Sequence, residues 1–189
     1  MVSCDGDPPQ VYFNECDAHA AAWLRNLFPR AVVDERDIRD VRPGDLAGYR
    51  HVALFGGIGG WEAALQISGW PEDLEVWSGS PPCQPFSQAG QQRGEADERH
   101  LWPEMRRLIA ECRPQHVVGE QVASRLGRAW LSRVRLDLER MGYGVGAVDL
   151  CAASLGAPHI RQRLYWVAES SGARRGWAAI TGGHRGRSG

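Results

Sequence analysis

One cysteine stands in a stretch that would hold its side chain in place. Cys83 lies in the run 79–90, GSPPCQPFSQAG, with two prolines before it and one after it. Each proline fixes its own φ angle and removes one N–H donor, so the loop cannot easily bend away. A thiol held in this way suits nucleophilic catalysis. A proline-rich turn with the cysteine as a small apolar filler explains the loop alone equally well.

Other residues that could bind or react follow short apolar runs. Four such features come at or just past the end of a run: Glu15, Asp37, the glycine-rich run 56–60 and Glu120. Ligands of a parallel α/β sheet bind beyond the carboxyl ends of its strands. We therefore expect these features and Cys83 to meet at one rim. Taken singly, Glu15 and Asp37 are better explained as solvated loop carboxylates.

The types of these residues suggest a nucleoside and a base as ligands. Glu15 could accept hydrogen bonds from both hydroxyls of a ribose, and Asp37 from an exocyclic amine. Glu120 could bond to a base ring. Arg161 and Arg163 would share a face of an extended segment, where they could hold a phosphate or a pyrimidine edge. A pair of surface arginines is the alternative.

The glycine-rich run 56–60, GGIGG, is a weak signal by itself. Glycines let a backbone approach a ligand closely. The run lacks the GxGxxG fingerprint of dinucleotide-binding folds and the GK[ST] of a P-loop. A tight turn between a strand and a helix, with no ligand, is the commoner explanation of such a run.

Apolar runs alternate with helical patterns along the chain. Strands are predicted at 10–14, 31–33, 51–55, 74–77, 115–119, 145–150 and 164–168, and helices at 18–27, 61–67, 101–111 and 129–141. This alternation predicts an α/β fold with a mainly parallel sheet. We expect a flexible lead-in at 1–9, one catalytic domain at 10–169 and a disordered Gly/Arg-rich tail at 170–189.

Composition excludes several classes of function. The 189 residues suffice for one domain. The cysteines number five, which is odd, and form no CxxC pair, so the sequence argues against a disulfide framework and against a zinc site. No metal is expected. All 22 basic residues are arginine, so no lysine can be catalytic, and the net charge of −1 is not that of a typical nucleic-acid binder. Without a signal peptide or an apolar stretch of ~20 residues, we expect a cytoplasmic protein with no membrane contact.

In combination, the motifs resemble those of the DNA cytosine-5 methyltransferases. The similarity runs from about residue 11 to 168. It rests on NECD at 14–17, DI at 37–38, FGGIGG at 55–60, PPCQ at 81–84 with the FS and AG that follow, Asp97, Arg99 and Leu101, EQV at 120–122, and Arg161 with Arg163. The resemblance implies a Rossmann-like S-adenosylmethionine-dependent methyltransferase fold with a mostly parallel, doubly wound sheet.

The resemblance also implies roles for individual residues. S-adenosylmethionine would be bound by Glu15, Cys16, Asp37, Ile38, Phe55, Gly57, Ile58, Gly59, Gly60, Pro82 and Leu101. Catalysis would use Cys83, Glu120, Arg161 and Arg163, and contacts with nucleic acid would come from Gln84, Ser87, Arg99 and the same two arginines.

The implied reaction methylates C5 of a cytosine flipped out of double-stranded DNA. Cys83 would bond to C6, and Glu120 would hydrogen-bond or protonate N3. The resemblance further implies a prokaryotic or phage-encoded enzyme of restriction–modification type. Methylation of cytosine in transfer RNA, or an inactive or partner-dependent subunit of a split enzyme, would use the same residues. A nicotinamide-binding module is disfavoured because GxGxxG is missing.

The chain departs from the family pattern at four points. The acidic motif and Asp37 precede the glycine loop, whereas the family normally has the glycine loop first. Gln121 replaces an asparagine, and His159 replaces a glutamine. The chain ends near the point where a target-recognition domain would begin. A second chain that carries this domain is therefore a candidate partner.

Overall fold

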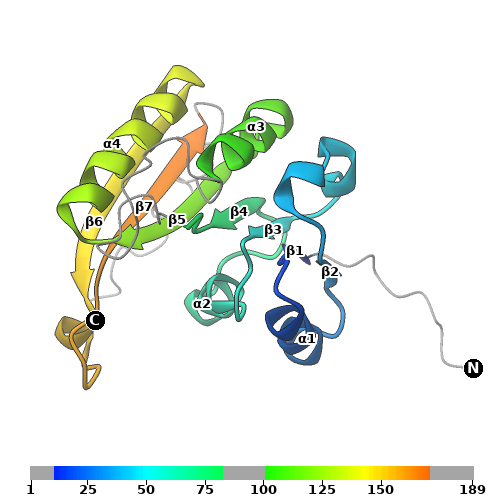
Figure 1. The fold of residues 1–189 in the computed structure, drawn as a ribbon, viewed down its shortest axis with the longest axis horizontal. Helices are drawn as coiled ribbons and strands as arrows, with labels where there is room; N and C mark the ends of the chain where they lie inside the picture. Colours follow the sequence, from blue (N-terminus) through cyan, green and yellow to red (C-terminus); the bar gives the residue numbers. More distant parts are fainter. Residues whose placement is uncertain (1–10, 83–100, 171–189) are drawn as a thin grey trace, which may run out of the picture.

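The computed structural model describes residues 11–82 and 101–170, which build a seven-stranded sheet in the order β2-β1-β3-β4-β5-β7-β6 (Figure 1). Its strands are β1 Val11–Asn14, β2 Val32–Asp34, β3 His51–Leu54, β4 Val76–Gly79, β5 His116–Val122, β6 Tyr143–Cys151 and β7 Gln162–Ser170. Strands β1 to β5 pair in parallel. Strand β7 is antiparallel to β5, and β6 is antiparallel to β7. The mostly parallel α/β sheet predicted from the sequence is thus confirmed.

Helices cover both faces of the sheet (Figure 1). The described α-helices are α1 Ala18–Leu27, α2 Gly60–Ser68, α3 Trp102–Cys112 and α4 Arg125–Arg140. Short 3-10 helices span η1 Ile38–Asp40, η2 Pro43–Leu46 and η5 Ala152–Leu155. Helices α3 and α4 lie on one face, and α1 and α2 lie on the other. No helix within 11–82 or 101–170 is long and apolar enough to cross a membrane.

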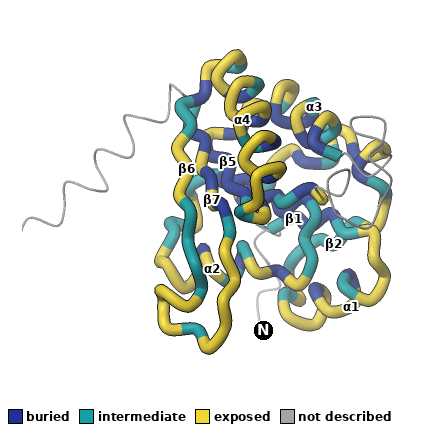
Figure 2. Tube along the Cα trace, turned by 60° about the vertical axis from the view of Figure 1, so that its left-hand side comes forward, coloured by how far each residue is buried: buried dark blue, intermediate teal, exposed yellow. Residues whose placement is uncertain are grey.

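Each layer of helices buries apolar side chains against the sheet. The largest cluster joins α3 and α4 to the strands and includes Trp77, Met105 and Trp130. Phe13 and Leu24 are fully buried beneath α1. Burying a side chain of this size contributes roughly 1.5–3 kcal/mol. Buried residues follow the central strands, whereas the outer face of α4 is largely exposed (Figure 2).

The order of the strands in space differs from their order in the chain. Strand β3, which leads into the glycine loop, lies between β1 and β4. Phe13 of β1 pairs with Val33 of β2 on one side and with Ala53 of β3 on the other. The carboxyl ends of β1, β3 and β4 therefore lie side by side, although the acidic motif precedes the glycine loop in the sequence.

Several boundaries differ from the sequence prediction. Helix α4 begins four residues before the predicted 129, because the Ser124 side chain caps it by accepting a hydrogen bond from the N–H of Gly127. A Cβ on Gly127 would lie 2.0 Å from the carbonyl oxygen of Val122. Glycine is needed for that close approach. Strand β4 begins at Val76 rather than at 74.

Candidate active site

The acidic motif and the glycine loop meet at the carboxyl ends of β1 and β3. Oε2 of Glu15 accepts a hydrogen bond from the N–H of Gly57 at 2.7 Å, and Oε1 accepts one from the N–H of Asp17 at 2.9 Å. The N–H of Gly56 donates to the carbonyl of Asn14 at 3.0 Å. Residues 42 positions apart are thus joined through one carboxylate.

The backbone of the glycine loop has an unusual conformation. Gly57 and Gly59 have φ angles of 54° and 76°, and Phe55, which is not a glycine, has a φ of 58°. Such a residue is often found at a functional site, because the fold must hold it against its own preference. Gly59 caps α2 without a side-chain hydrogen bond. The first N–H groups of α2 therefore remain available to an anionic group.

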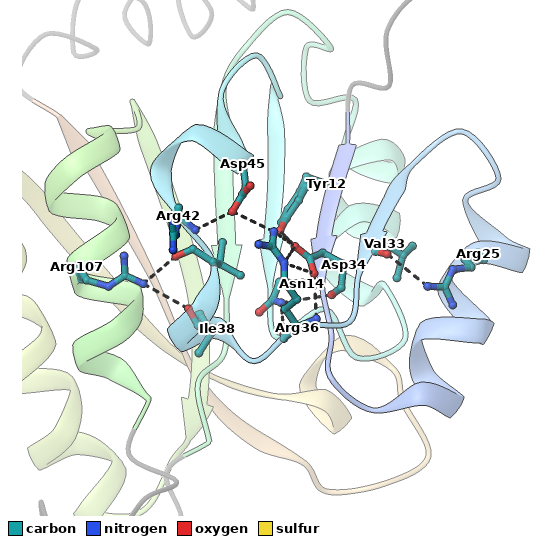
Figure 3. Close-up of polar contacts among 11 residues, drawn as sticks. Tyr12, Asn14, Arg25, Val33, Asp34, Arg36, Ile38, Arg42, Asp45 and Arg107 are labelled. Atoms are coloured by element: carbon teal, nitrogen blue, oxygen red, sulfur yellow. Dashed lines mark hydrogen bonds and ion pairs between the residues drawn. The ribbon is translucent and has the colours of Figure 1, made fainter.

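The loop after β2 is held by a polar cluster (Figure 3). The hydroxyl of Tyr12 donates to Oδ2 of Asp34 at 2.5 Å. Arg36 forms ion pairs with Asp34 at 2.6 Å and with Asp45 at 3.0 Å. Burial opposes ionisation of Asp34, but the hydrogen bonds from Arg36 and Tyr12 outweigh it and lower its pKa to about 2. Burial and the neighbouring Asp34 raise the pKa of Tyr12, so its hydroxyl stays a donor.

Asp37 and Ile38 lie on this loop. The side chain of Asp37 caps η1 by accepting a hydrogen bond from the N–H of Arg39 at 2.9 Å. Ile38 is buried in the main apolar cluster. The side chain of Asn14 donates to the carbonyl of Arg36 at 2.8 Å, which ties the loop to β1. Both predicted residues thus stand next to the strand that ends at Glu15.

A second group of residues gathers where β4 and β5 end and where β7 begins. Nε of Arg163 lies 3.2 Å from Oε2 of Glu120. Neither atom makes a well-aligned hydrogen bond within the described residues, although both are buried. The hydroxyl oxygen of Ser80 accepts hydrogen bonds from the N–H of Glu120 and from the indole N–H of Trp61, both at 3.3 Å. Trp61 also contacts Tyr165 edge-on at 6.1 Å.

Ser80 connects three parts of the site through one oxygen atom. It lies directly before the two prolines of the cysteine loop. Its partners are Glu120 on β5 and Trp61 on α2, the helix that follows the glycine loop. The start of the cysteine loop is therefore fixed relative to both the glycine loop and Glu120.

The remaining predicted residues have varied positions. Arg161 lies exposed, one residue before β7, and only Arg163 of the two arginines pairs with Glu120. Gln121 is buried, and its side-chain oxygen accepts the N–H of Val122 at 2.9 Å. Among the residues proposed to bind the cofactor, Cys16, Ile58 and Pro82 are exposed and Leu101 is half-buried. Cys83, Gln84, Ser87 and Arg99 lie outside the described residues.

Sequence reasoning missed Tyr12, Asp34, Arg36 and the role of Ser80. Asp34 follows the β-branched pair at 32–33, so the rule that selected Glu15 as a carboxylate at a strand end would also have selected Asp34. No pattern in the sequence indicates that Tyr12 and Arg36 converge on it. Their convergence follows from the parallel pairing of β1 with β2.

Comparison with known proteins identifies relatives of this chain. A family model described as C-5 cytosine-specific DNA methylase matches residues 9–175. The chain is 38% identical over 96 residues to the Type II methyltransferase M.AplI of Arthrospira platensis, covering 50% of this chain and 28% of that protein. It is 28% identical over 167 residues to M.AgeI of Thalassovita gelatinovora, covering 87% of this chain and 35% of that protein.

Solved structures share the fold. A mutant of DNMT2 from Spodoptera frugiperda superposes with a TM-score of 0.58 at 18% identity, covering 88% of this chain and 43% of that one. A DNA modification methyltransferase encoded within an Escherichia coli prophage gives 0.58 at 20% identity, covering 86% and 40%. This chain thus spans about a third of the length of the two curated relatives above. Because the family model matches most of its residues, this chain belongs to the C-5 cytosine-specific DNA methylase family.

Proposed function

We propose that residues 10–169 form the catalytic domain of a DNA cytosine-5 methyltransferase of restriction–modification type. One observation carries the proposal beyond family membership: Glu15 accepts the N–H of Gly57, so two motifs in an unusual order still form one site. The strand that leads to Cys83 lies next to the strand of the glycine loop. The residues for the cofactor and for the base therefore share one rim.

The residues around Glu15 fit S-adenosylmethionine. The Glu15 carboxylate would accept hydrogen bonds from the ribose, and Asp37 from the adenine amine. The glycine loop, with its three positive φ angles, would let the backbone approach the ligand, and the start of α2 suits a carboxylate. Phe55, Ile58 and Leu101 would provide apolar contacts. S-adenosylmethionine, when bound, supplies a methyl group on a positively charged sulfur.

The remaining residues would act on cytosine. The thiolate of Cys83 forms a bond to C6, and the electron pair of the C5–C6 double bond moves to C5. Glu120 holds N3 while negative charge develops on the ring. C5 then accepts the methyl group. Loss of the C5 proton and cleavage of the bond between Cys83 and C6 restore the ring.

The two arginines would have different tasks. Arg163, which pairs with Glu120, would hold the cytosine, because its guanidinium is already next to the carboxylate that bonds the ring. The exposed Arg161 would contact the nucleic-acid backbone. Gln84, Ser87 and Arg99 would contribute further contacts. Sequence recognition requires base contacts beyond these, so we infer that a second chain or a further domain provides them.

Methyl transfer tests the proposal directly. Labelled S-adenosylmethionine is incubated with mixed-sequence duplex DNA, with transfer RNA in parallel, and with Cys83→Ala and Glu120→Gln as variants. We expect label on DNA, none with Cys83→Ala, and a loss of about 10²-fold or more with Glu120→Gln. Glu139→Gln is the matched control, because Glu139 is exposed on α4 and pairs with Arg135.

The other outcomes refute separate parts of the proposal. Label on transfer RNA alone would keep the cysteine chemistry and refute DNA as the substrate. Label that persists with Cys83→Ala would refute the covalent step. Absence of label on both acceptors would show that this chain is inactive without a partner. A covalent adduct with DNA that contains 5-fluorocytosine would independently support Cys83 as the nucleophile.

A further inference from the structure

Arg107 connects helix α3 to the loop that carries Asp37 and Ile38 (Figure 3). Its Nη2 donates to the carbonyl of Val41 at 2.9 Å and to that of Ile38 at 3.4 Å. Its Nε donates to Glu104, one turn earlier on α3, at 3.0 Å. About a third of its side chain is exposed, so the guanidinium lies partly beneath the surface. One planar group thus holds both ends of the η1 turn.

The same loop is fixed from its other side by contacts that do not involve α3. The Asn14 side chain bonds the carbonyl of Arg36, and Arg36 bridges Asp34 and Asp45. These contacts hold the beginning and the end of the loop near β1. The middle of the loop, where η1 lies, is held by burial of Ile38 and by Arg107. Loss of Arg107 would therefore loosen the part that faces the proposed adenine site.

We propose that Arg107 is a positioning residue for the cofactor, which keeps Asp37 and Ile38 in the geometry that binds adenine. This inference rests on the proposed function. A binding site that is formed for only part of the time has an apparent Kd larger than the intrinsic one by the inverse of that fraction. Arg107 would raise the formed fraction without touching the ligand.

The link has a second consequence, because α3 begins directly after the segment that contains Cys83. Arg107 lies in the second turn of this helix, and its hydrogen bonds cross 66 and 69 residues of sequence. A bound adenosine that stabilises η1 would also stabilise the start of α3 through Arg107.

Arg106 provides a matched control. It is the neighbouring residue of the same type, its side chain is 51% exposed, and it pairs with Asp137 of α4 at 3.7 Å. Arg107→Met keeps an unbranched side chain and removes the donors. Arg107→Lys keeps a charged donor nitrogen for the two carbonyls but lacks the second nitrogen that bonds Glu104, so the donor is less well oriented. We expect the affinity for the cofactor to fall most in Arg107→Met and less in Arg107→Lys. Arg106→Met should leave this affinity unchanged.

Titration calorimetry of S-adenosylhomocysteine against the full chain tests the inference. We expect binding about tenfold weaker for Arg107→Met, which corresponds to about 1.4 kcal/mol. Arg107→Lys should lie between this variant and the wild type, and Arg106→Met within about twofold of the wild type. In the transfer assay, the KM for S-adenosylmethionine should rise for Arg107→Met, whereas kcat at saturation and the KM for DNA should not change.

Each contrary result overturns a different statement. Equal affinity of Arg107→Met and wild type overturns the inference and leaves the proposed function intact. A fall in kcat with an unchanged KM for S-adenosylmethionine assigns Arg107 a merely structural role and also overturns it. A wild type that binds no S-adenosylhomocysteine refutes the proposed cofactor, and the inference with it. If Arg107→Met fails to fold, wild-type affinity in Arg107→Lys overturns the inference.

Discussion

Alanine in place of Gly59 should damage the glycine loop more than alanine at its neighbours. Gly59 has a φ of 76°, and a Cβ there would lie 2.4 Å from Cε2 of Phe28 and 3.1 Å from Cδ2 of Leu24. The left-handed conformation costs an L-residue roughly 1–2 kcal/mol. Overpacking against the half-buried ring of Phe28 costs roughly 1–3 kcal/mol more. The two terms together give about 2–5 kcal/mol, a large part of the stability of a typical domain.

Two adjacent glycines separate these terms. Gly57 has a φ of 54° and no atom within 4 Å of a built Cβ, so Gly57→Ala should lose about 1–2 kcal/mol from conformation alone. Gly60 is the first residue of α2, has no positive φ, and also has open space around it. Because alanine favours helix by up to about 1 kcal/mol over glycine, Gly60→Ala should be neutral or slightly stabilising.

Urea unfolding in the absence of ligand measures all three variants. We expect the midpoint of Gly59→Ala to fall most, that of Gly57→Ala to fall moderately, and that of Gly60→Ala to stay or rise. Binding of S-adenosylmethionine should weaken in the same order, since the loop would no longer approach the ligand. If Gly59→Ala unfolds at the same urea concentration as Gly60→Ala, the argument from Phe28 and from the left-handed turn is wrong.

Three further changes test other contacts. The pKa of Asp34 in the folded chain is about 2, below its ordinary 3.8. The wild type should therefore be more stable than Asp34→Asn above pH ~5, and this advantage should vanish as the pH falls toward 2. Acid unfolding of both proteins, followed by circular dichroism, measures the difference. Glu15→Gln replaces one of the two carboxylate oxygens by an NH2 group, so this variant should bind S-adenosylmethionine about tenfold more weakly in titration calorimetry. Unchanged affinity would count against Glu15 as a residue that binds the cofactor. Glu62 is buried beside His51, with Oε2 3.0 Å from its Nδ1, so Glu62→Ala should cost about 3 kcal/mol in urea unfolding, and additivity with His51→Ala would contradict the pairing.

The sequence best predicted which residues of the candidate site lie close together when those residues come at the ends of strands. Glu15 and Gly57 were expected at one rim because both follow apolar runs, and they lie in hydrogen-bond contact. Glu120 and Arg163 were expected near a base, and they form an ion pair. This works because parallel pairing brings strand ends together whatever the connections between them.

Other features depend on tertiary contacts that leave no pattern in the sequence. The start of α4 was missed because Gly127 lies against the carbonyl of Val122, a contact that exists only in the folded chain. Arg161 lies exposed one residue before β7, whereas Arg163 lies within the strand and pairs with Glu120, and their shared residue type does not indicate this difference. The partners of Asp34 depend on which strands pair. Side chains from separate strands meet only when the sheet has formed.

The position of β3 between β1 and β4 affects how a nascent chain can fold on the ribosome. Strands β1 and β2 are synthesised before β3, so one whole edge of β1 has no partner until the residues of β3 have been made. Glu15 likewise waits for Gly57, which is translated 42 residues later. An exposed strand edge is prone to pairing with other chains. A pause in translation between residues 34 and 51 would therefore prolong the stage at which the β1 edge is exposed, and pairing of β1 with β3 ends that stage.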